Sequence, residues 1–461
     1  ERHCSGLGRL ERILEGIDLG RMSELTGVSE DVMREVGREF AAAGGAFATT
    51  RVGVQTAPNT TLTEWAVQCL NAVTGNVDRR GGVYFNPGAI DVPKLIERFS
   101  ARRNPAPSRI GGYPQIFGGP PASVFADDVL SDAPERIRAL IVVAGNPVIT
   151  FPDTAKVERA LGRLDLLVTI DLYRSDTGAF AHYNLPAATA FEKGSVHFLT
   201  STFEPYPFVE WKPKVVDPPP GVRSEWKIFR DLSRAAGVPF LNDPWVDRAA
   251  RVLEACGIEF GEEMLLRVVL LGVSRLGRLK KAPGGIRTGE IRWGEFLEKR
   301  IATADRRIDL LPVEFAGALE DALADPPRPS DEYPLMLIGG ARRAAGYNSW
   351  THNIPALADK LGGNWATIAE RDAEALGIRS GDRVRIETPA GAIEIEARTS
   401  KDIRPGVVAV HQFWGHTYES STRTSRRTPG VNVNFLHATI DLDRFTGMPI
   451  YNGRPCRVTR L

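Results

Sequence analysis

Two short apolar runs constrain the fold of this chain more than any other feature. Residues 140–143 form a continuous apolar run, as a buried parallel strand requires, and the mostly apolar residues 166–170 predict the next strand. Residues 144–147 break the first run, and the pattern predicts a helix over 152–161. The whole β–α–β unit takes about 30 residues, which is an ordinary length. The sequence therefore predicts an α/β protein with Rossmann-like parallel-sheet layers.

The remaining sequence divides into three predicted parts: a partial α/β domain at 1–125, an α/β nucleotide-binding domain at 126–330, and a β-barrel domain at 331–461. In the first part a helix is predicted at 29–43, a strand at 47–54 and a second helix at 61–74. A proline-rich linker at 326–329 ends the second part. In the third part apolar and polar residues alternate on both sides of a turn at 389–391, which predicts a hairpin with one buried face.

Charge and cysteine usage exclude several function classes. The 461 residues carry 58 basic and 57 acidic side chains, and no charge run indicates a nucleic-acid partner. No apolar stretch reaches the ~20 residues of a membrane span. The four cysteines lie far apart, and the seven histidines show no zinc spacing, so no metal ligands are assigned in this chain. No signal peptide is in view, and a cytoplasmic location is the expectation.

One constellation indicates a nucleotide site at the end of the first predicted strand. Gly145, Asn146 and Pro147 form a sharp turn into a helix, where free backbone N–H groups suit a phosphate. Asp171 ends the next strand, where a carboxylate accepts from a ribose hydroxyl or from guanine N–H groups, and Ser175 lies one turn further on. There is no G-x-G-x-x-G, so a standard NAD fingerprint fails, and an ordinary α/β turn stays open as the alternative.

A second constellation lies in the predicted barrel domain. Paired arginines that follow glycines clamp phosphate well, and amides hydrogen-bond heteroaromatic edges. The candidates are Gly340, Arg342, Arg343, Asn348, Ser349, His411 and Asn434. A solvated loop with barrel-closing contacts stays open as the alternative. No acid–base pair stands out, so the catalytic residues are unknown.

Four ordered blocks resemble the molybdopterin oxidoreductases of the formate dehydrogenase and nitrate reductase type. RVGVQ with LNAVTGNVDRRGG resembles the family's glycine–glutamine segment and its glycine-rich turn, and VVAGNP resembles its nucleotide-binding turn. Residues 171–195 resemble the block that ends in E-x-x-G-T, although Ser175 and Ser195 replace threonines and His182 replaces an aspartate. The segments from IGGARRAAGYNSW to VNVNF resemble the dinucleotide-binding barrel.

The resemblance implies bis(molybdopterin guanine dinucleotide) with molybdenum or tungsten as the cofactor, and it adds Gly53 and Gln55 to the residues near it. It implies an oxidoreductase subunit that moves electrons, an oxygen atom or hydride to or from a small substrate such as formate or nitrate. The family's metal ligand and 4Fe–4S cluster lie upstream of anything in this chain. The expectation is therefore a carboxy-terminal two-thirds of a catalytic subunit, inactive in isolation, that works with a missing amino-terminal segment or subunit and an electron-transfer subunit. A non-catalytic scaffold subunit of a redox complex is the alternative, and an unrelated α/β nucleotide-binding enzyme is a third hypothesis.

Overall fold

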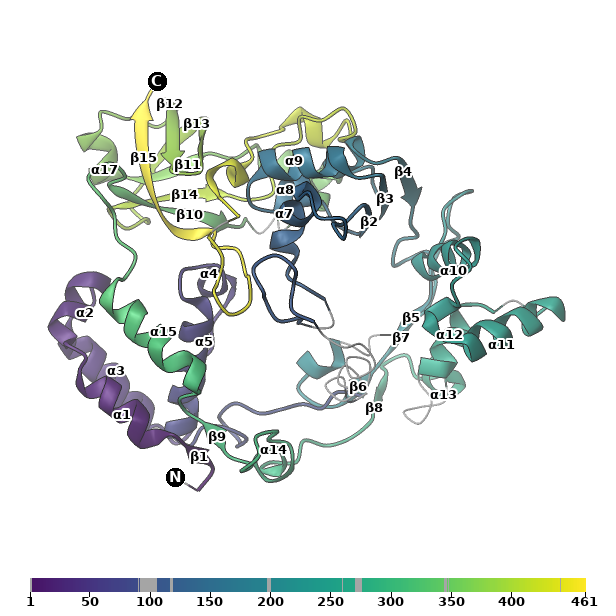
Figure 1. Ribbon diagram of the computed structural model, residues 1–461, viewed down its shortest axis with the longest axis horizontal. Coiled ribbons are helices and arrows are strands. Elements are labelled where there is room, and N and C mark those ends of the chain that lie inside the picture. Colours follow the sequence, from purple (N-terminus) through teal and green to yellow (C-terminus); the bar gives the residue numbers. More distant parts are fainter. Residues whose placement is uncertain are drawn as a thin grey trace.

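The computed structural model describes residues 2–89, 91, 106–116, 119–196, 200–258, 260–269, 276–343, 346, 348–439 and 441–461. Figure 1 shows the chain as a broken ring: the amino-terminal helices and the barrel lie on one side, and the parallel sheet and the middle of the chain on the other. The fold class predicted from the sequence, parallel α/β layers followed by a β-barrel, is confirmed. None of the helices in the described part of the chain combines the length and apolar character needed to cross a bilayer.

The amino-terminal part is helical and packs against a later segment. Its helices are α1 (Leu7–Glu15), α2 (Leu19–Thr26), α3 (Glu30–Ala42), α4 (Val52–Gln55) and α5 (Thr60–Val73). Strand β1 (Cys4–Ser5) pairs with β9 (Ile308–Asp309), and α15 (Val313–Ala324) follows β9. Leu10, Leu310 and Leu311 form the buried centre of this region. Residues from 308 to 324 therefore share a core with the amino-terminal helices.

The helix predictions in this part are confirmed, but the strand predicted over 47–54 is wrong. Ser29 caps α3 by accepting from the Val32 N–H, as its position before the apolar stripe predicted. Residues 46–51 form no strand, and α4 takes the rest of the predicted segment. The Asn71 side chain donates to the Ala48 carbonyl and accepts from its N–H, both at 2.8 Å. A side-chain amide thus satisfies backbone groups that a partner strand would otherwise satisfy.

The β–α–β unit forms as the apolar runs predicted. Strands β2 (Ala139–Val143), β3 (Leu166–Asp171) and β4 (Tyr183–Pro186) make a parallel sheet, with Ile141 opposite Val168. Around it lie η1 (Ala122–Val124), α7 (Phe125–Leu130), α8 (Pro147–Thr150), α9 (Thr154–Arg163) and η2 (Asp176–Ala179). One face packs on α7 and α9 around Leu167, and α10 (Glu225–Ala235) covers the other face over β3.

One detail of the first strand differs from the prediction. A continuous apolar run predicts burial on both faces, but Ile141 and Val143 are 43% and 41% exposed. The reason is that β2 is an edge strand of the described sheet and α10 reaches only β3 and β4.

The middle of the chain contains short elements around small clusters. These are β5 (Ser195–Val196), η3 (Thr200–Phe203), β6 (Phe208–Val209), β7 (Trp211–Lys212), η4 (Phe240–Asn242), α11 (Pro244–Ala255), α12 (Glu262–Val269), α13 (Leu276–Lys280), β8 (Ile286–Arg287) and α14 (Glu295–Lys299). β5 pairs with β7, and β6 pairs with β8.

The carboxy-terminal part is a closed barrel with strand order β10–β14–β11–β13–β12–β15. The strands are β10 (Leu335–Ala341), β11 (Ala366–Ala369), β12 (Arg383–Thr388), β13 (Gly391–Ser400), β14 (Val407–His411) and β15 (Asn452–Arg460), with η5 (Ser349–Asn353), α16 (Pro355–Leu361), α17 (Glu370–Ala375), η6 (Ser425–Arg427) and η7 (Val433–Leu436) between them. The predicted hairpin is β12–β13, and its inward residues Val384, Ile386 and Ile395 are at most 2% exposed. Closure removes the free strand edges of this sheet.

Candidate functional site

A cavity of about 460 Å³ lies where the β–α–β unit meets the barrel domain, and we call it the boundary cavity. Its lining residues are Ala144, Gly145, Asn146, Thr150, Asp171, Leu172, Tyr173, Arg174, Ser175, Asp176, Asn348, Ser349, Trp350, Asn353, Phe413, His416, Ser421 and Ser425. Six of the residues predicted from sequence lie here: Gly145, Asn146, Asp171, Ser175, Asn348 and Ser349. Because they come from the carboxyl ends of β2 and β3 and from the segment after β10, only the folded chain brings them together.

The turn that follows β2 shapes one wall of the boundary cavity. Ala144 has φ 49°, a left-handed conformation that costs a non-glycine residue about 1 kcal/mol. Its N–H donates to the Ile170 carbonyl at 2.9 Å, which holds the turn against β3. Pro147 then begins α8 at a position that needs no N–H donor. The sequence directs the chain sharply away from the sheet edge at this point, as strand-end binding sites require.

The free N–H groups expected at this turn are partly taken. The Val148 N–H donates to Thr177 Oγ1 at 3.2 Å, and the Asn146 Oδ1 accepts from the Thr177 N–H at 3.1 Å. The helix α8 is also only one turn long. The prediction of an open helix start for a phosphate is therefore wrong for the Val148 N–H, because a side chain of η2 already caps it.

Asp171 keeps a carboxylate at the end of β3, where the sequence predicted it. Its Oδ1 accepts from the Leu172 N–H at 2.7 Å. Burial raises the pKa of Asp171, and the backbone N–H groups of Leu172 and Tyr173 partly oppose this. A partly desolvated carboxylate with acceptor capacity left over gains from any ligand that donates hydrogen bonds to it.

Ser175 places an unsatisfied hydroxyl at the same wall. Its Oγ is buried and has no hydrogen-bond partner among the described residues. A buried hydroxyl without a partner costs free energy that a bound polar group recovers. The donor and acceptor set of this wall thus suits a polar heteroaromatic or ribose group.

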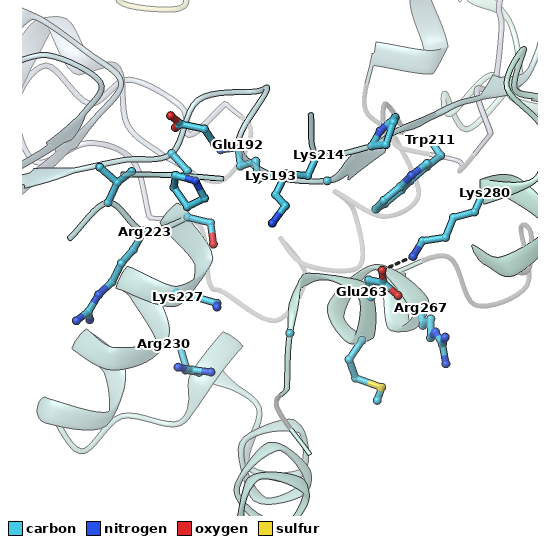
Figure 2. A pocket seen from close by; sticks show the side chains of 18 of the residues that line it. Glu192, Lys193, Trp211, Lys214, Arg223, Lys227, Arg230, Glu263, Arg267 and Lys280 are labelled. Carbon is cyan, nitrogen blue, oxygen red and sulfur yellow. Dashed lines mark hydrogen bonds and ion pairs between the residues drawn. The ribbon is translucent and has the colours of Figure 1, made fainter. Parts of the chain in front are cut away.

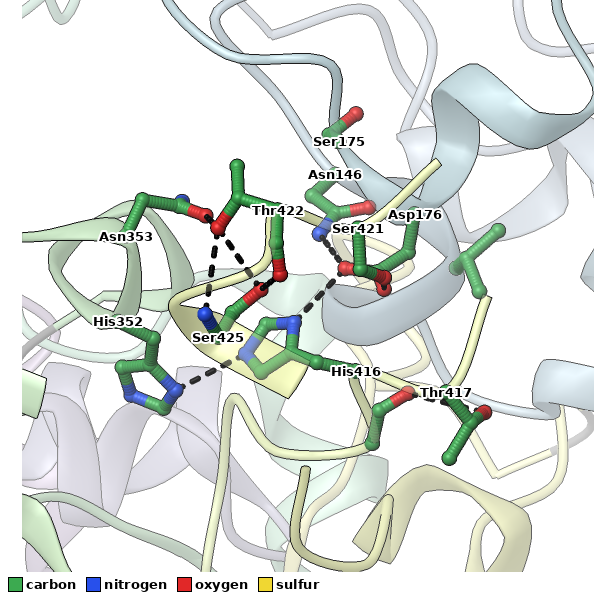
Figure 3. Close-up of polar contacts among 12 residues, drawn as sticks. Asn146, Ser175, Asp176, His352, Asn353, His416, Thr417, Ser421, Thr422 and Ser425 are labelled. Atoms are coloured by element: carbon green, nitrogen blue, oxygen red, sulfur yellow. Dashed lines mark hydrogen bonds and ion pairs between the residues drawn. The ribbon is translucent and has the colours of Figure 1, made fainter. Parts of the chain in front are cut away.

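A buried polar chain forms part of the cavity wall and was not predicted from sequence. Asp176 is 2% exposed, and its Oδ2 accepts from His416 Nδ1 and from Asn146 Nδ2, each at 2.9 Å. Its Oδ1 accepts from the Ser421 hydroxyl. His416 Nε2 lies 2.9 Å from Nδ1 of His352. Figure 3 shows these side chains, from the β–α–β unit and the barrel domain, converging on one line of hydrogen bonds.

The pKa directions agree with this arrangement. Burial is the largest single influence and raises the pKa of Asp176, but the combined effects of His416, Ser421 and Asn146 lower the pKa overall. Burial lowers the pKa of His352 to about 3, so its ring is neutral near pH 7. His352 and His416 therefore share one proton across their contact. This hydrogen-bonded chain of side chains holds Asn146 and the cavity wall in position.

The other predicted residues lie elsewhere. Gly53 and Gly340 meet at Asn452, whose Nδ2 donates to the Gly53 carbonyl and whose Oδ1 accepts from the Gly340 N–H, both at 2.9 Å. Gln55 is exposed on α4, and Pro147 is buried at the start of α8. The backbone of Gly340 thus packs closely against the protein itself: a Cβ on Gly340 would lie 2.9 Å from Asn452 Oδ1.

The two predicted arginines differ in their surroundings. Arg343 donates to the Gly363 carbonyl at 3.1 Å and lies over the Trp365 ring at 4.5 Å, so it holds the barrel's own loop. Arg342 lies 4.9 Å over the ring of Phe413, a residue that lines the boundary cavity. Of the pair, Arg342 is the one beside the cavity.

The last two predicted residues are inside the barrel domain. Burial lowers the pKa of His411 to about 4, and its ring packs edge-on against Trp365. Asn434 is 1% exposed and donates from Nδ2 to the Ile149 carbonyl at 2.6 Å. Asn434 thus fastens η7 to α8, across the same boundary that the cavity occupies.

Comparison with known proteins agrees with this layout. The family model described as molybdopterin oxidoreductase matches residues 35–235, and the one described as the molydopterin dinucleotide binding domain matches residues 335–455. The chain belongs to the molybdopterin oxidoreductases. The two matched regions contribute the two walls of the boundary cavity, and the family match supports a molybdopterin cofactor.

Individual relatives are distant but cover most of the chain. The molybdopterin-containing subunit of thiosulfate reductase from Salmonella typhimurium is 25% identical over 95% of this chain. The alpha subunit of formate dehydrogenase 1 from Methanococcus maripaludis is 26% identical over 94% of it. The chain spans 61% and 63% of the lengths of these two relatives. The acetylene hydratase structure from Pelobacter acetylenicus has the same fold, with a TM-score of 0.77 at 17% identity over the whole chain and 67% of that structure.

Proposed function

We propose that the boundary cavity binds the guanine nucleotide part of a molybdopterin guanine dinucleotide. The observation that carries this proposal is the convergence of Asp171, Ser175, Asn348 and Ser349 from both family-matched regions on one cavity. The Asp171 carboxylate accepts the two N–H groups of a guanine edge, a pairing that adenine does not offer. The buried Ser175 hydroxyl gains a partner in the ligand.

One further residue completes the proposed site. Arg342, beside Phe413, supplies a guanidinium for the phosphates. The hydrogen-bonded chain through Asp176 and His416 holds the cavity wall in place and does not pair with the phosphates of the ligand. In this proposal Gly53, Gln55, Gly340, Arg343, His411 and Asn434 act through the shape of the barrel and its contacts.

We further propose that the whole enzyme is a catalytic subunit that carries bis(molybdopterin guanine dinucleotide) with molybdenum or tungsten. When bound, that cofactor supplies the redox chemistry, and the protein positions it. The described residues contain no group of three or more His, Cys, Asp or Glu side chains arranged to hold a metal ion. The proposal therefore assigns the metal ligand and a 4Fe–4S cluster to a further segment or subunit, and an electron-transfer subunit to the complex. Formate and nitrate are the proposed type of substrate.

The test is nucleotide discrimination by calorimetry. The chain should bind GDP more tightly than ADP, with IDP between them because hypoxanthine lacks the exocyclic amine. Asp171→Asn should weaken GDP binding by about 1–3 kcal/mol, because an amide repels one of the two donors that a carboxylate accepts.

The matched control is Asp165→Asn, which changes an exposed carboxylate at the opposite end of β3. It should leave the GDP affinity unchanged. Equal affinities for GDP and ADP in the unmodified chain, or a GDP affinity that Asp171→Asn leaves intact, would rule out this assignment.

A further inference from the structure

A second, larger cavity of about 1150 Å³ lies in the middle of the chain, away from the boundary cavity. It is formed by the loop before β5, by β7, by α10 and the segment before it, and by α12 and α13. Seven cationic side chains line it: Lys193, Lys214, Arg223, Lys227, Arg230, Arg267 and Lys280. We call it the cationic cavity, and nothing in the proposed dinucleotide site uses it.

The three carboxylates that line the cationic cavity are already engaged. Glu263 pairs with Lys280, and Asp231 pairs with both Arg223 and Arg230. The Glu192 Oε2 accepts from the Thr189 N–H at 2.8 Å. A ligand that enters the cavity therefore meets seven cations against three carboxylates, two of which are paired with lining cations.

Several of the cations are held in position by carboxylates outside the cavity. Lys193 pairs with Glu225, and Arg230 pairs with Glu254 at 2.9 Å while its side chain is 13% exposed. Carboxylates behind the wall restrict these long side chains, which lowers the entropy that a ligand must remove. Figure 2 shows Lys193, Lys227 and Arg230 on one side and Arg267 and Lys280 across the space from them.

Arg267 differs from the others in being available. It is exposed on α12 and makes no ion pair with the described residues. Its guanidinium has five donors suited to a tetrahedral oxyanion. Opposite it, Lys227 presents an ammonium group from α10.

We propose that the cationic cavity binds a small molecule that carries two or more phosphate groups. Cations on facing walls match an elongated polyanion better than a single phosphate, because one phosphate cannot contact both walls of a cavity of this size. The binding is electrostatic and falls as salt rises, because the site is open to solvent. This site is separate from the proposed guanine site in the boundary cavity.

The experiment measures the binding of tripolyphosphate to the full chain by isothermal titration calorimetry at two ionic strengths. Tripolyphosphate should bind at least about tenfold more tightly than orthophosphate, as expected for additional charge-assisted contacts. The double variant Lys227→Gln with Arg267→Gln should lose about tenfold or more in tripolyphosphate affinity. A matched control, Arg371→Gln with Lys401→Gln, removes the same charge from exposed positions of the barrel domain and should retain the affinity.

Two results would overturn the proposal. One is the absence of tripolyphosphate binding in the unmodified chain. The other is tripolyphosphate binding that does not depend on the cationic cavity. The double variant would then retain the affinity, or Arg342→Gln at the boundary cavity would abolish it, which would place the polyanion in the boundary cavity. Circular dichroism of each variant separates a lost site from a lost fold, and Arg267→Gln alone keeps the test open if the double variant fails to fold.

Discussion

The two cavities of this chain hold their polar groups in opposite ways. In the boundary cavity Asp176, His352 and His416 are each 2% exposed and hydrogen-bond to one another. In the cationic cavity the charges sit on long, partly exposed side chains paired across the surface. Removing one partner of a buried, hydrogen-bonded charge is strongly destabilising, whereas exposed ion pairs contribute little. The boundary cavity is therefore part of the folded core, and the cationic cavity is a surface feature that can change without unfolding.

Acid should produce the largest effect, and it acts through two buried histidines: His352 next to the boundary cavity and His437 at the end of η7 in the barrel domain. No histidine is among the described residues that line the cationic cavity. Burial lowers the pKa of His352 and of His437 to about 3 each, while an unfolded histidine titrates near 6.5. As the pH falls below 6.5, these two histidines therefore bind protons in the unfolded state but stay neutral in the folded state. The free energy of unfolding should fall by about 1.4 kcal/mol per pH unit for each ring, or roughly 5 kcal/mol for both between pH 6.5 and 4.5.

Urea unfolding at several pH values measures this slope. The variant His352→Gln with His437→Gln should flatten the profile, because glutamine does not titrate. A free energy of unfolding that stays constant from pH 6.5 to 4.5 would show that these rings are protonated in the folded state.

Removal of the buried carboxylate should be the next largest effect. Asp176→Ala leaves His416, Asn146 and Ser421 without their acceptor and should lower the free energy of unfolding by about 3 kcal/mol or more. The lowered pKa of Asp176 means that its contribution is present above the unfolded pKa and is lost as the pH falls through the folded value. Chemical denaturation at pH 7 gives the difference directly.

The control for this change is Asp132→Ala, since the Asp132 side chain is 96% exposed in its pair with Arg163. It should change stability by less than about 0.5 kcal/mol. Equal losses in the two variants would contradict the contrast between the cavities.

The parts of the fold that could be predicted are those indicated by the local pattern of apolar and polar residues. The alternation around 384–397 gave the β12–β13 hairpin, and the apolar runs gave β2 and β3, because each pattern reports burial of a nearby segment. The strand predicted at 47–54 failed since its apolar residues carry no information about a partner, and the Asn71 amide took that place. The predicted burial of β2 on both faces was wrong for a similar reason, because an apolar run does not show which neighbours cover the strand.

The site was predictable where it lies at strand ends and not where it depends on long-range contacts. Asp171 ends β3 and Ser175 lies four residues later, so topology places them. The chain from Asp176 to His352 joins three distant segments, and a lone histidine in sequence gives no sign of it. His411, a candidate named from the sequence, ends β14 and packs on Trp365, whereas the cavity is lined by His416, five residues later.

A smaller effect should distinguish a ligand-binding carboxylate from a structural one within the boundary cavity. Burial raises the pKa of Asp171, so its ionised form opposes folding. This cost is complete above the folded pKa and declines to nothing as the pH falls from the folded pKa to below the unfolded pKa. Asp171→Asn should therefore leave the thermal midpoint unchanged or higher at pH 7, in contrast to Asp176→Ala. A sharp drop in the midpoint of Asp171→Asn would mark Asp171 as a second structural carboxylate.

The smallest effect is expected at the rim of the cationic cavity, and it tests whether this region is a surface feature throughout. Arg267 is exposed and makes no ion pair with the described residues, so Arg267→Gln should change the free energy of unfolding by less than about 0.5 kcal/mol. Arg230 is the matched comparison, because its side chain is 13% exposed and pairs with Asp231 and Glu254. Arg230→Gln should cost about 1–2 kcal/mol, since it removes one of the two arginines that pair with each of these partly buried carboxylates. Urea denaturation of both variants at low and high salt measures the difference. If Arg267→Gln costs as much as Arg230→Gln, the wall on α12 contributes to the folded core, and the contrast drawn between the two cavities does not hold for this side of the molecule.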